Sequence, residues 1–278
     1  MVGCNISMLD IVFAENLYES KKNQLSYWNY EMVISKKLSL SRVLKSISIT
    51  GKVAGEDVDF GTLRYAPMQV ADCFFMNNHL VHSGMDQRKV HVLMRETAPK
   101  LDYEHTLKIA GKPIKPIAIH HGLLLGMKKE SGEGEEIVIA KMSKSKPDTC
   151  IFVHDSPDNI EKKIKKAYCP MVEKHWTMDE IKKVQQYNPM LNWLEMMVFP
   201  ANRQLQVFRP VAYGGDKLYS TFEEVKEDYF SGNLHPSDLK SALANNLIEW
   251  FKPIKSFADN NIDILDLFPN KSTQSQNT

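Results

Sequence analysis

The sequence lacks several features that would assign it to a specialised class of protein. Its 278 residues contain no apolar run approaching the about 20 residues of a membrane-spanning helix. Its four cysteines lie far apart without a CxxC pair, a pattern that favours reduced thiols over a disulfide framework or a zinc site. The opening segment lacks the basic start and the cleavage site of a signal peptide. We therefore expect a cytoplasmic protein that has no membrane partner.

The chain also lacks an excess of charge of one sign. A formal net charge of +1 gives no general attraction to nucleic acid, so RNA binding would depend on local basic patches, and we expect no DNA partner. The composition, 43% apolar and 25% charged, is typical of globular proteins. A chain of this length can bury one large core or two smaller ones, and we expect two domains.

Residues 8–50 carry a helical pattern. Leu9, Val12, Phe13 and Leu17 recur at helical spacing, and Ser26 is placed to cap the helix that follows. The basic side chains of this region either form a solvated face or contact RNA. They are Lys36, Lys37, Arg42 and Lys45.

The next hundred residues predict helices followed by strands and loops. Pro67 is suited to the first turn of a helix. A second helix is predicted over 86–98, ended by Pro99, with Val90, Leu93 and Met94 on its buried face. A short buried strand is predicted at 137–140.

Helical signals dominate the rest of the chain. Ser156 is predicted to cap a helix that starts at Pro157, and Gly232 is predicted to end another. Two capping boxes are predicted, formed by Thr177 with Glu180 and by Thr221 with Glu224. Residues 270–278 are polar, lack periodicity and are predicted to be disordered.

The segment KMSKS, from Lys141 to Ser145, combines two lysines with two hydroxyls. Lysine is a compact charge on a flexible stem, able to follow phosphate oxygens as charge moves onto a leaving group. Serine hydroxyls add hydrogen-bond donors. The pattern predicts a loop that holds the phosphates of ATP, and the alternative is a solvated basic loop.

A second group of polar residues is predicted to converge on one helix face. Gln69, Asp72 and Met76 have the spacing i, i+3, i+7, and Tyr65 precedes them by about one turn. Gln87 adds an amide near the start of the following helix. A carboxylate, two amides and a phenol suit an amino-acid pocket, although a buried polar network that serves only structure is the alternative.

Together the motifs resemble the tyrosyl-tRNA synthetases of the archaeal and eukaryotic type, a class I synthetase family. The similarity runs from about residue 10 to about residue 260. It rests on YAPMQVAD, GMDQRKVH, KMSKS, KKIKKAYC, AYGGDKLY and HPSDLK, which occur in the family's order.

This resemblance implies an α/β fold, namely a class I Rossmann-like catalytic domain over 1–152, incomplete at its N-terminus, and an all-helical anticodon-binding domain over 153–269. The reaction implied is the activation of tyrosine with ATP, followed by transfer to tRNA(Tyr). ATP is the substrate, Mg²⁺ is expected on its phosphates, and no metal site of the protein itself is expected. A homodimer is implied too, with an interface on the helices around 70–98.

The resemblance also assigns roles to residues. The tyrosine-binding residues are Tyr65, Gln69, Asp72 and Gln87, with Asp72 accepting a hydrogen bond from the substrate phenol. The residues that act on ATP are Lys141, Met142, Ser143, Lys144 and Ser145. The residues that read the anticodon are Tyr213, His235 and Asp238.

Alternatives stay open for several of these residues. Tyr213 could be a surface residue of a turn, and Asp238 could serve only to cap a helix. His120 and His121 have no carboxylate or cysteine at ligand spacing and are interpreted as structural.

The sequence departs from the family pattern at one point, because no HIGH motif precedes the tyrosine pocket. The first hypothesis is an incomplete version of an active tyrosine–tRNA ligase. The second is a catalytically inactive fragment or paralogue that binds tRNA or a protein. The third is a chain that works with another chain.

Overall fold

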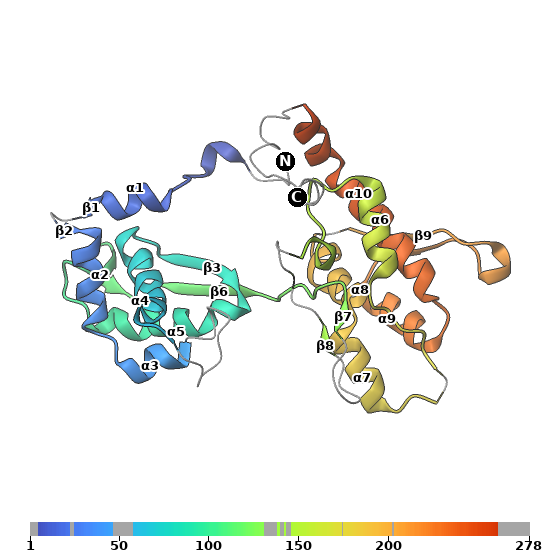
Figure 1. Cartoon of the computed structure of the whole chain (residues 1–278), viewed down its shortest axis with the longest axis horizontal. Helices are drawn as coiled ribbons and strands as arrows, with labels where there is room; N and C mark the ends of the chain where they lie inside the picture. Colours follow the sequence, from blue (N-terminus) through green and yellow to red (C-terminus); the bar gives the residue numbers. More distant parts are fainter. Residues whose placement is uncertain are drawn as a thin grey trace, which may run out of the picture. The chain divides into compact units, whose positions relative to one another are not determined.

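The computed structural model describes residues 5–22, 25–46, 58–130, 138, 139, 142, 146–173, 175–201 and 203–260. The chain divides into two compact units (Figure 1). Ile6–Leu123 form the first, called the N-terminal unit. Leu124–Thr278, together with the first five residues, form the second, called the C-terminal unit. Each unit has a hydrophobic core of its own.

The core of the N-terminal unit forms where α4 lies between α2 and α5 (Figure 1). Val70, Ala71 and Phe74 of α4 are fully buried there. The helices and strands of this unit are α1 (Ala14–Glu19), β1 (Lys21–Lys22), β2 (Leu25–Ser26), α2 (Tyr27–Ser35), α3 (Leu40–Ser46), α4 (Phe60–Phe75), β3 (Leu80–Gly84), α5 (Arg88–Thr97), β4 (Leu107–Ile109), β5 (Lys112–Ile114) and β6 (Ile117–His121). Short 3₁₀ turns are η1 (Ile6–Met8), η3 (Met85–Gln87) and η4 (Ala98–Lys100).

Helix α4 begins earlier than the sequence predicted. Its N-cap is Asp59, whose carboxylate accepts hydrogen bonds from the backbone N–H of Thr62 at 2.8 Å and from its hydroxyl at 2.6 Å. Pro67 therefore lies inside the helix, and its predicted place in the first turn is wrong. A proline there removes one backbone hydrogen bond. Pro67 is buried, so packing offsets part of that loss.

The parallel pair of β3 and β6 is the Rossmann-like element among the described residues, with α5 in the crossover between its strands (Figure 1). His82 lies opposite Ile119 in this register. Val81 and Ala118 pack against the core, as strand alternation requires. The predicted buried face of α5 is confirmed, since Val90, Leu93 and Met94 are at most 3% exposed.

Two predictions near the start of the chain have different outcomes. Ser26 caps α2, because its hydroxyl accepts from the backbone N–H of Asn29 at 3.4 Å, as predicted. The helix predicted through Leu9, Val12, Phe13 and Leu17 is present only at Leu17, because α1 begins at Ala14 and so excludes Leu9, Val12 and Phe13. All three side chains are more than half exposed, and their spacing gains no burial that would stabilise a helix.

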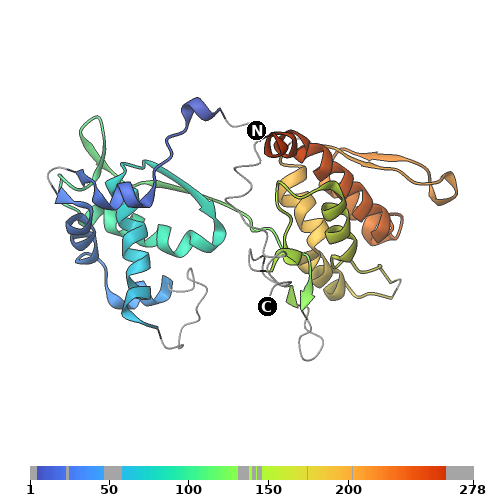
Figure 2. The same ribbon diagram turned by 45° about the horizontal axis from the view of Figure 1, so that its top comes forward.

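The C-terminal unit is built on α10, which packs along α6 (Figure 2). Ile160 and Ile164 of α6 are buried in its core with Leu239, Leu243 and Leu247 of α10. The helices and strands are β7 (Lys129–Glu130), β8 (Val138–Ile139), α6 (Pro157–Lys166), α7 (Met178–Tyr187), α8 (Pro189–Trp193), β9 (Leu205–Val207), β10 (Lys217–Tyr219), α9 (Phe222–Ser231) and α10 (Pro236–Asp259). Short turns are η5 (Pro147–Thr149), the π-helical η6 (Leu194–Val198) and η7 (Val211–Tyr213).

The helix boundaries of this unit confirm the predicted signals. Ser156 caps α6, and Pro157 is its first residue. Both capping boxes form, at Thr177 with Glu180 and at Thr221 with Glu224. Gly232 ends α9 in the left-handed region at φ 82°.

This unit also contains two short antiparallel strand pairs. β8 lies within the strand predicted at 137–140 and pairs with β7. The second pair, β9 with β10, lies in the part of the chain that was predicted to be all helical. The segment that connects β9 with β10 extends away from the helices in both views (Figures 1 and 2). Among the described residues, no helix is long and apolar enough to cross a membrane. The predicted disordered tail, 270–278, lies outside the described residues.

We expect Thr221→Ala to lower the free energy of unfolding by about 1 kcal/mol, because it removes the hydroxyl that accepts from the backbone N–H of Glu224. Urea denaturation followed by circular dichroism measures the change. Thr221→Ser keeps the hydroxyl and is the matched control, with stability close to that of the wild type. An equal loss in both variants would contradict the capping role.

Candidate functional site

The amides predicted to bind an amino acid meet in the N-terminal unit. Gln69 of α4 donates from Nε2 to Oε1 of Gln87, the residue just before α5, at 3.1 Å. Gln87 in turn donates to Asp86 at 3.1 Å. The Gln69 carbonyl oxygen, Oε1, is buried and has no hydrogen-bond partner in the described part of the chain. A buried acceptor without a donor is costly, and a ligand N–H would satisfy it.

The carboxylate of Asp72 lies one helical turn from Gln69. Its Oδ1 accepts a hydrogen bond of 2.5 Å from the phenol of Tyr27. Burial raises the pKa of Asp72 above its ordinary value of 3.8, and the Tyr27 hydrogen bond opposes that shift. Burial, and then the same hydrogen bond, raise the pKa of Tyr27. Asp72 therefore holds a phenol of this chain in the manner predicted for the phenol of a substrate.

Tyr18 lies near both Asp72 and Tyr65. Its pKa is raised by burial first, and then by the charges of Asp72 and Tyr65. Tyr65 itself is 53% exposed. Met76, predicted on the same face, is the residue that caps the C-terminus of α4.

Sequence reasoning missed Tyr27. This side chain is fully buried, and its hydroxyl contacts both Asp72 and the carbonyl of Met68. It lies in the first turn of α2, 45 residues before its partner. Spacing within a helix carries no signal for such a contact, since only the packing of α2 on α4 creates it.

Four of the residues predicted to act on ATP, Lys141, Ser143, Lys144 and Ser145, lie outside the described residues. The fifth, Met142, is half-buried against the core of the C-terminal unit. In the segment between Met142 and α6, Asp155 forms a mostly buried ion pair with Lys163 at 2.6 Å. The same carboxylate accepts from the backbone N–H of Phe152 at 2.8 Å.

The histidines of β6 contact other histidines. His120 lies 3.0 Å from His91, and His121 lies 3.1 Å from His82, measured between ring nitrogens. Burial first, and then His120, lower the pKa of His91. Among the described residues, no group of three or more histidine, cysteine, aspartate or glutamate side chains is arranged to hold a metal ion.

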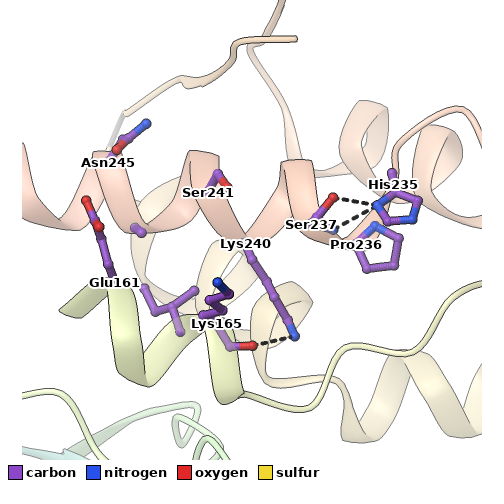
Figure 3. Close-up of a pocket in the computed structure, with 10 residues that line it drawn as sticks. Glu161, Lys165, His235, Pro236, Ser237, Lys240, Ser241 and Asn245 are labelled. Atoms are coloured by element: carbon purple, nitrogen blue, oxygen red, sulfur yellow. Dashed lines mark hydrogen bonds between the residues drawn. The ribbon is translucent and has the colours of Figure 1, made fainter. Parts of the chain in front are cut away.

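The residues predicted to read the anticodon lie in the C-terminal unit. Tyr213 belongs to η7, between β9 and β10, and is 74% exposed. His235 is the N-cap of α10, and its Nδ1 accepts from the backbone N–H of Ser237 at 3.1 Å (Figure 3). In the neutral ring the proton therefore lies on Nε2, which is a donor. Asp238 is a half-buried residue of the first turn of α10, but the capping side chain is that of His235.

Arg209 connects the turn that carries Tyr213 with the loop that leads to His235. Its Nε donates to the carbonyl of Gly215 at 2.8 Å, and its Nη1 donates to the carbonyl of Asn233 at 2.7 Å. The first contact holds the turn that carries Tyr213, and the second holds the loop that leads to His235. Sequence reasoning missed this guanidinium, because its two partners are carbonyls that no side-chain pattern reveals.

Comparisons with known proteins identify the family of the chain. The family model described as class I tRNA synthetases (W and Y) matches residues 6–252. The chain belongs to this family. The resemblance predicted from the motifs is confirmed, and so is the class I fold.

The chain is similar to archaeal tyrosine–tRNA ligases. It is 41% identical to those of Thermococcus sibiricus and Pyrococcus furiosus over 99% of the chain and 71% of each relative. The solved tyrosyl-tRNA synthetase from Pyrococcus horikoshii, complexed with L-tyrosine, superposes with a TM-score of 0.75 at 42% identity. That alignment covers 87% of this chain and 64% of the solved one, so the chain spans less than two thirds of that structure.

We expect Asp72→Asn to raise the free energy of unfolding at neutral pH, because the raised pKa of Asp72 makes its charged form costly in the folded state. A raised folded pKa gives a contribution that is present below the ordinary value of 3.8 and lost as the pH rises through the folded value. The advantage of the variant should therefore shrink as the pH falls toward 3.8. Urea denaturation at several pH values measures it.

The exposed carboxylate of Asp10 provides a control, because Asp10→Asn removes the same charge without relieving burial. An Asp72→Asn variant that is less stable than the wild type at neutral pH, or a stability difference that grows on acidification, would contradict the assignment.

Proposed function

We propose that the chain activates tyrosine with ATP to form tyrosyl-adenylate and transfers the tyrosyl group to tRNA(Tyr). The observation that carries this proposal is the buried carbonyl oxygen of Gln69, which has no hydrogen-bond donor among the described residues. This oxygen lies beside Gln87 and one helical turn from Asp72. An amino acid brings the missing donor as its ammonium group. The names of the relatives, which are tyrosine–tRNA ligases, support the same substrate.

The pocket would select tyrosine by hydrogen bonds. Asp72 has two carboxylate oxygens, and Tyr27 contacts only Oδ1 in the described structure. Oδ2 would accept from the phenol of the substrate, with Tyr65 at the edge of the pocket and Gln69 and Gln87 on the ammonium or carboxylate end. A site that bonds a buried hydroxyl rejects phenylalanine, because the polar groups would then be left unpaired.

The first step would be an in-line attack on ATP. A carboxylate oxygen of tyrosine forms a bond to the α-phosphorus, the bond to the β-phosphate oxygen breaks, and pyrophosphate leaves. Lys141 and Lys144 would stabilise the negative charge that develops on the leaving group, and Ser143 and Ser145 would donate hydrogen bonds. ATP would arrive as its Mg²⁺ complex. Met142 would anchor the segment through its contact with the core.

The second step would be acyl transfer. A hydroxyl at the 3′ end of tRNA attacks the carbonyl carbon of tyrosyl-adenylate, the acyl–phosphate bond breaks, and AMP leaves with the electron pair while the hydroxyl proton passes to the departing phosphate. The partner would be selected at its anticodon by Tyr213, which would stack on a base, and by His235 and Asp238, which would bond to base edges. The same proposal includes a homodimer with an interface at 70–98. It also includes domain limits at residues 152 and 269 and a cytoplasmic location.

An ATP–pyrophosphate exchange assay with tyrosine tests the first step. We expect tyrosine-dependent exchange, reduced by about 100-fold in Lys144→Ala because a positive charge aimed at the developing pyrophosphate is lost. Lys182→Ala removes an exposed lysine of α7 and is the matched control. Absence of exchange by the wild type, with tRNA binding retained, would overturn the ligase and favour a module that only binds tRNA or a protein.

Aminoacylation of tRNA(Tyr) tests the anticodon contacts. We expect Tyr213→Ala to lower kcat/KM for tRNA by about tenfold or more, since a stacked base is lost, while tyrosine-dependent exchange stays unchanged. Val211→Ala truncates an exposed neighbour in the same turn that has no aromatic ring, and it is the control. Equal activity of Tyr213→Ala and the control would remove Tyr213 from the contact surface.

A further inference from the structure

The ring of Tyr27 is held in one place beside the carboxylate of Asp72. Tyr27 has no exposed surface, and its ring centroid lies 4.7 Å from that of Tyr18 and 5.3 Å from those of Trp28 and Phe75. Aromatic rings packed at these distances have preferred orientations, and a close-packed core leaves them little room to turn. The packing of α1, α2 and α4 therefore determines where the hydroxyl of Tyr27 lies.

The single proton of this hydroxyl has two acceptors within reach. Oδ1 of Asp72 lies at 2.5 Å, and the backbone carbonyl of Met68 lies at 3.3 Å. A hydroxyl that donates to a carboxylate forms a bond of about 2.5–2.7 Å, whereas 3.3 Å is long for a hydrogen bond between two oxygens. The proton of Tyr27 is therefore donated to Asp72, so the protein itself occupies one oxygen of this carboxylate.

A carboxylate that is held at one oxygen has little freedom at the other. The terminal torsion of an aspartate is broad, so an unbound carboxylate turns easily. Both oxygens lie in one plane with their carbon, and holding Oδ1 of Asp72 therefore restricts the direction of Oδ2. Burial raises the pKa of Asp72, whereas the hydrogen bond from Tyr27 lowers it and favours the charged form. Tyr27 thus acts on both the orientation and the charge of Asp72.

We propose that Tyr27 is a positioning residue for the selection of tyrosine, because it holds Asp72 so that the second carboxylate oxygen is presented to the substrate phenol. This inference rests on the proposed function, which makes tyrosine the substrate. Tyr27 acts only through Asp72 and does not contact the substrate. Phenylalanine has no hydroxyl, so it would leave the oriented Oδ2 of a buried carboxylate without a donor, and a site of this kind rejects such a ligand.

Tyr30 provides a matched control, because it is a second buried tyrosine of α2. It is 1% exposed, and its ring centroid also lies 5.3 Å from that of Phe75. Its hydroxyl donates to the backbone carbonyl of His105 at 2.6 Å, which makes this contact structural. Replacing either tyrosine by phenylalanine removes one buried hydroxyl and its hydrogen bond, but only Tyr27→Phe releases Asp72.

Equilibrium dialysis of the full chain with labelled L-tyrosine and with labelled L-phenylalanine measures the selection directly. We expect Tyr27→Phe to weaken the binding of tyrosine by about tenfold, because Asp72 loses the hydrogen bond that orients it. The binding of phenylalanine should stay unchanged, so the preference for tyrosine falls by the same factor. Tyr30→Phe should keep the wild-type preference. Urea denaturation of both variants shows that they are folded under the conditions of the assay.

A double-mutant cycle tests whether Tyr27 acts through Asp72. Asp72→Ala removes the carboxylate and should weaken the binding of tyrosine by itself. Adding Tyr27→Phe to Asp72→Ala should cause no further loss, since two changes in one set of connected contacts are not additive. Adding Tyr30→Phe to Asp72→Ala should have the same effect on tyrosine binding as Tyr30→Phe alone.

A preference in Tyr27→Phe equal to that in Tyr30→Phe would overturn the positioning role. So would an equal loss of affinity for tyrosine and phenylalanine, which indicates damage to the whole pocket, or full additivity in the cycle. These measurements contain no ATP, and their outcome is therefore independent of the ligase reaction. A wild type that selects tyrosine through Tyr27 but shows no tyrosine-dependent pyrophosphate exchange would overturn the ligase and retain the positioning role. Exchange by the wild type, with an unaltered preference in Tyr27→Phe, would retain the ligase and remove Tyr27 from the selection of tyrosine.

Discussion

The burial of one face of α4 constrains the rest of the candidate tyrosine pocket. Val70, Ala71 and Phe74 have no exposed surface, because they lie in the core shared with α2 and α5. A helix is rigid, so burying that face leaves Gln69 and Asp72 on its border. There they meet Gln87 and Tyr27, which come from the two neighbouring helices or their ends.

This arrangement leaves polar groups in a costly state. The pKa of Asp72 is raised by burial, and the buried carbonyl of Gln69 has no donor in the part of the chain that the structure describes. Groups of this kind cluster at functional sites, where a ligand can relieve the cost. The pocket is thus less stable than an apolar helix face would be, and substrate binding can restore part of that stability.

A corresponding constraint acts in the C-terminal unit, where α10 packs on α6. Leu239 and Leu243 are fully buried against that core. Their burial determines which residues of the first turns of α10 line the cavity between α6 and α10, including Lys240 (Figure 3). His235 caps the same helix, so one side chain both ends a structural element and presents a donor. Arg209 holds the turn of Tyr213 to the loop that precedes α10.

The local signals in the sequence predicted much of this molecule. Ser26, Ser156 and the two capping boxes are where the pattern placed them, because a cap depends on atoms within four residues. The order of the motifs was sufficient for the family. Pro67 and the segment around Leu9 were misjudged, since a buried proline and an unburied apolar stripe depend on what packs against them.

The sequence by itself therefore determined the helix caps and the family, and it singled out Gln69, Asp72 and Gln87 as candidate pocket residues, which stays a prediction. Only the tertiary structure decided that Tyr27 bonds to Asp72, that Arg209 connects two loops and that Lys240 lines a cavity between α6 and α10. The physical reason is how far apart in the sequence the contacting residues lie. Caps and helix faces follow from neighbours along the chain. The Arg209–Asn233 and Tyr27–Asp72 contacts instead join residues 24 and 45 positions apart, and the cavity depends on whole helices packing together.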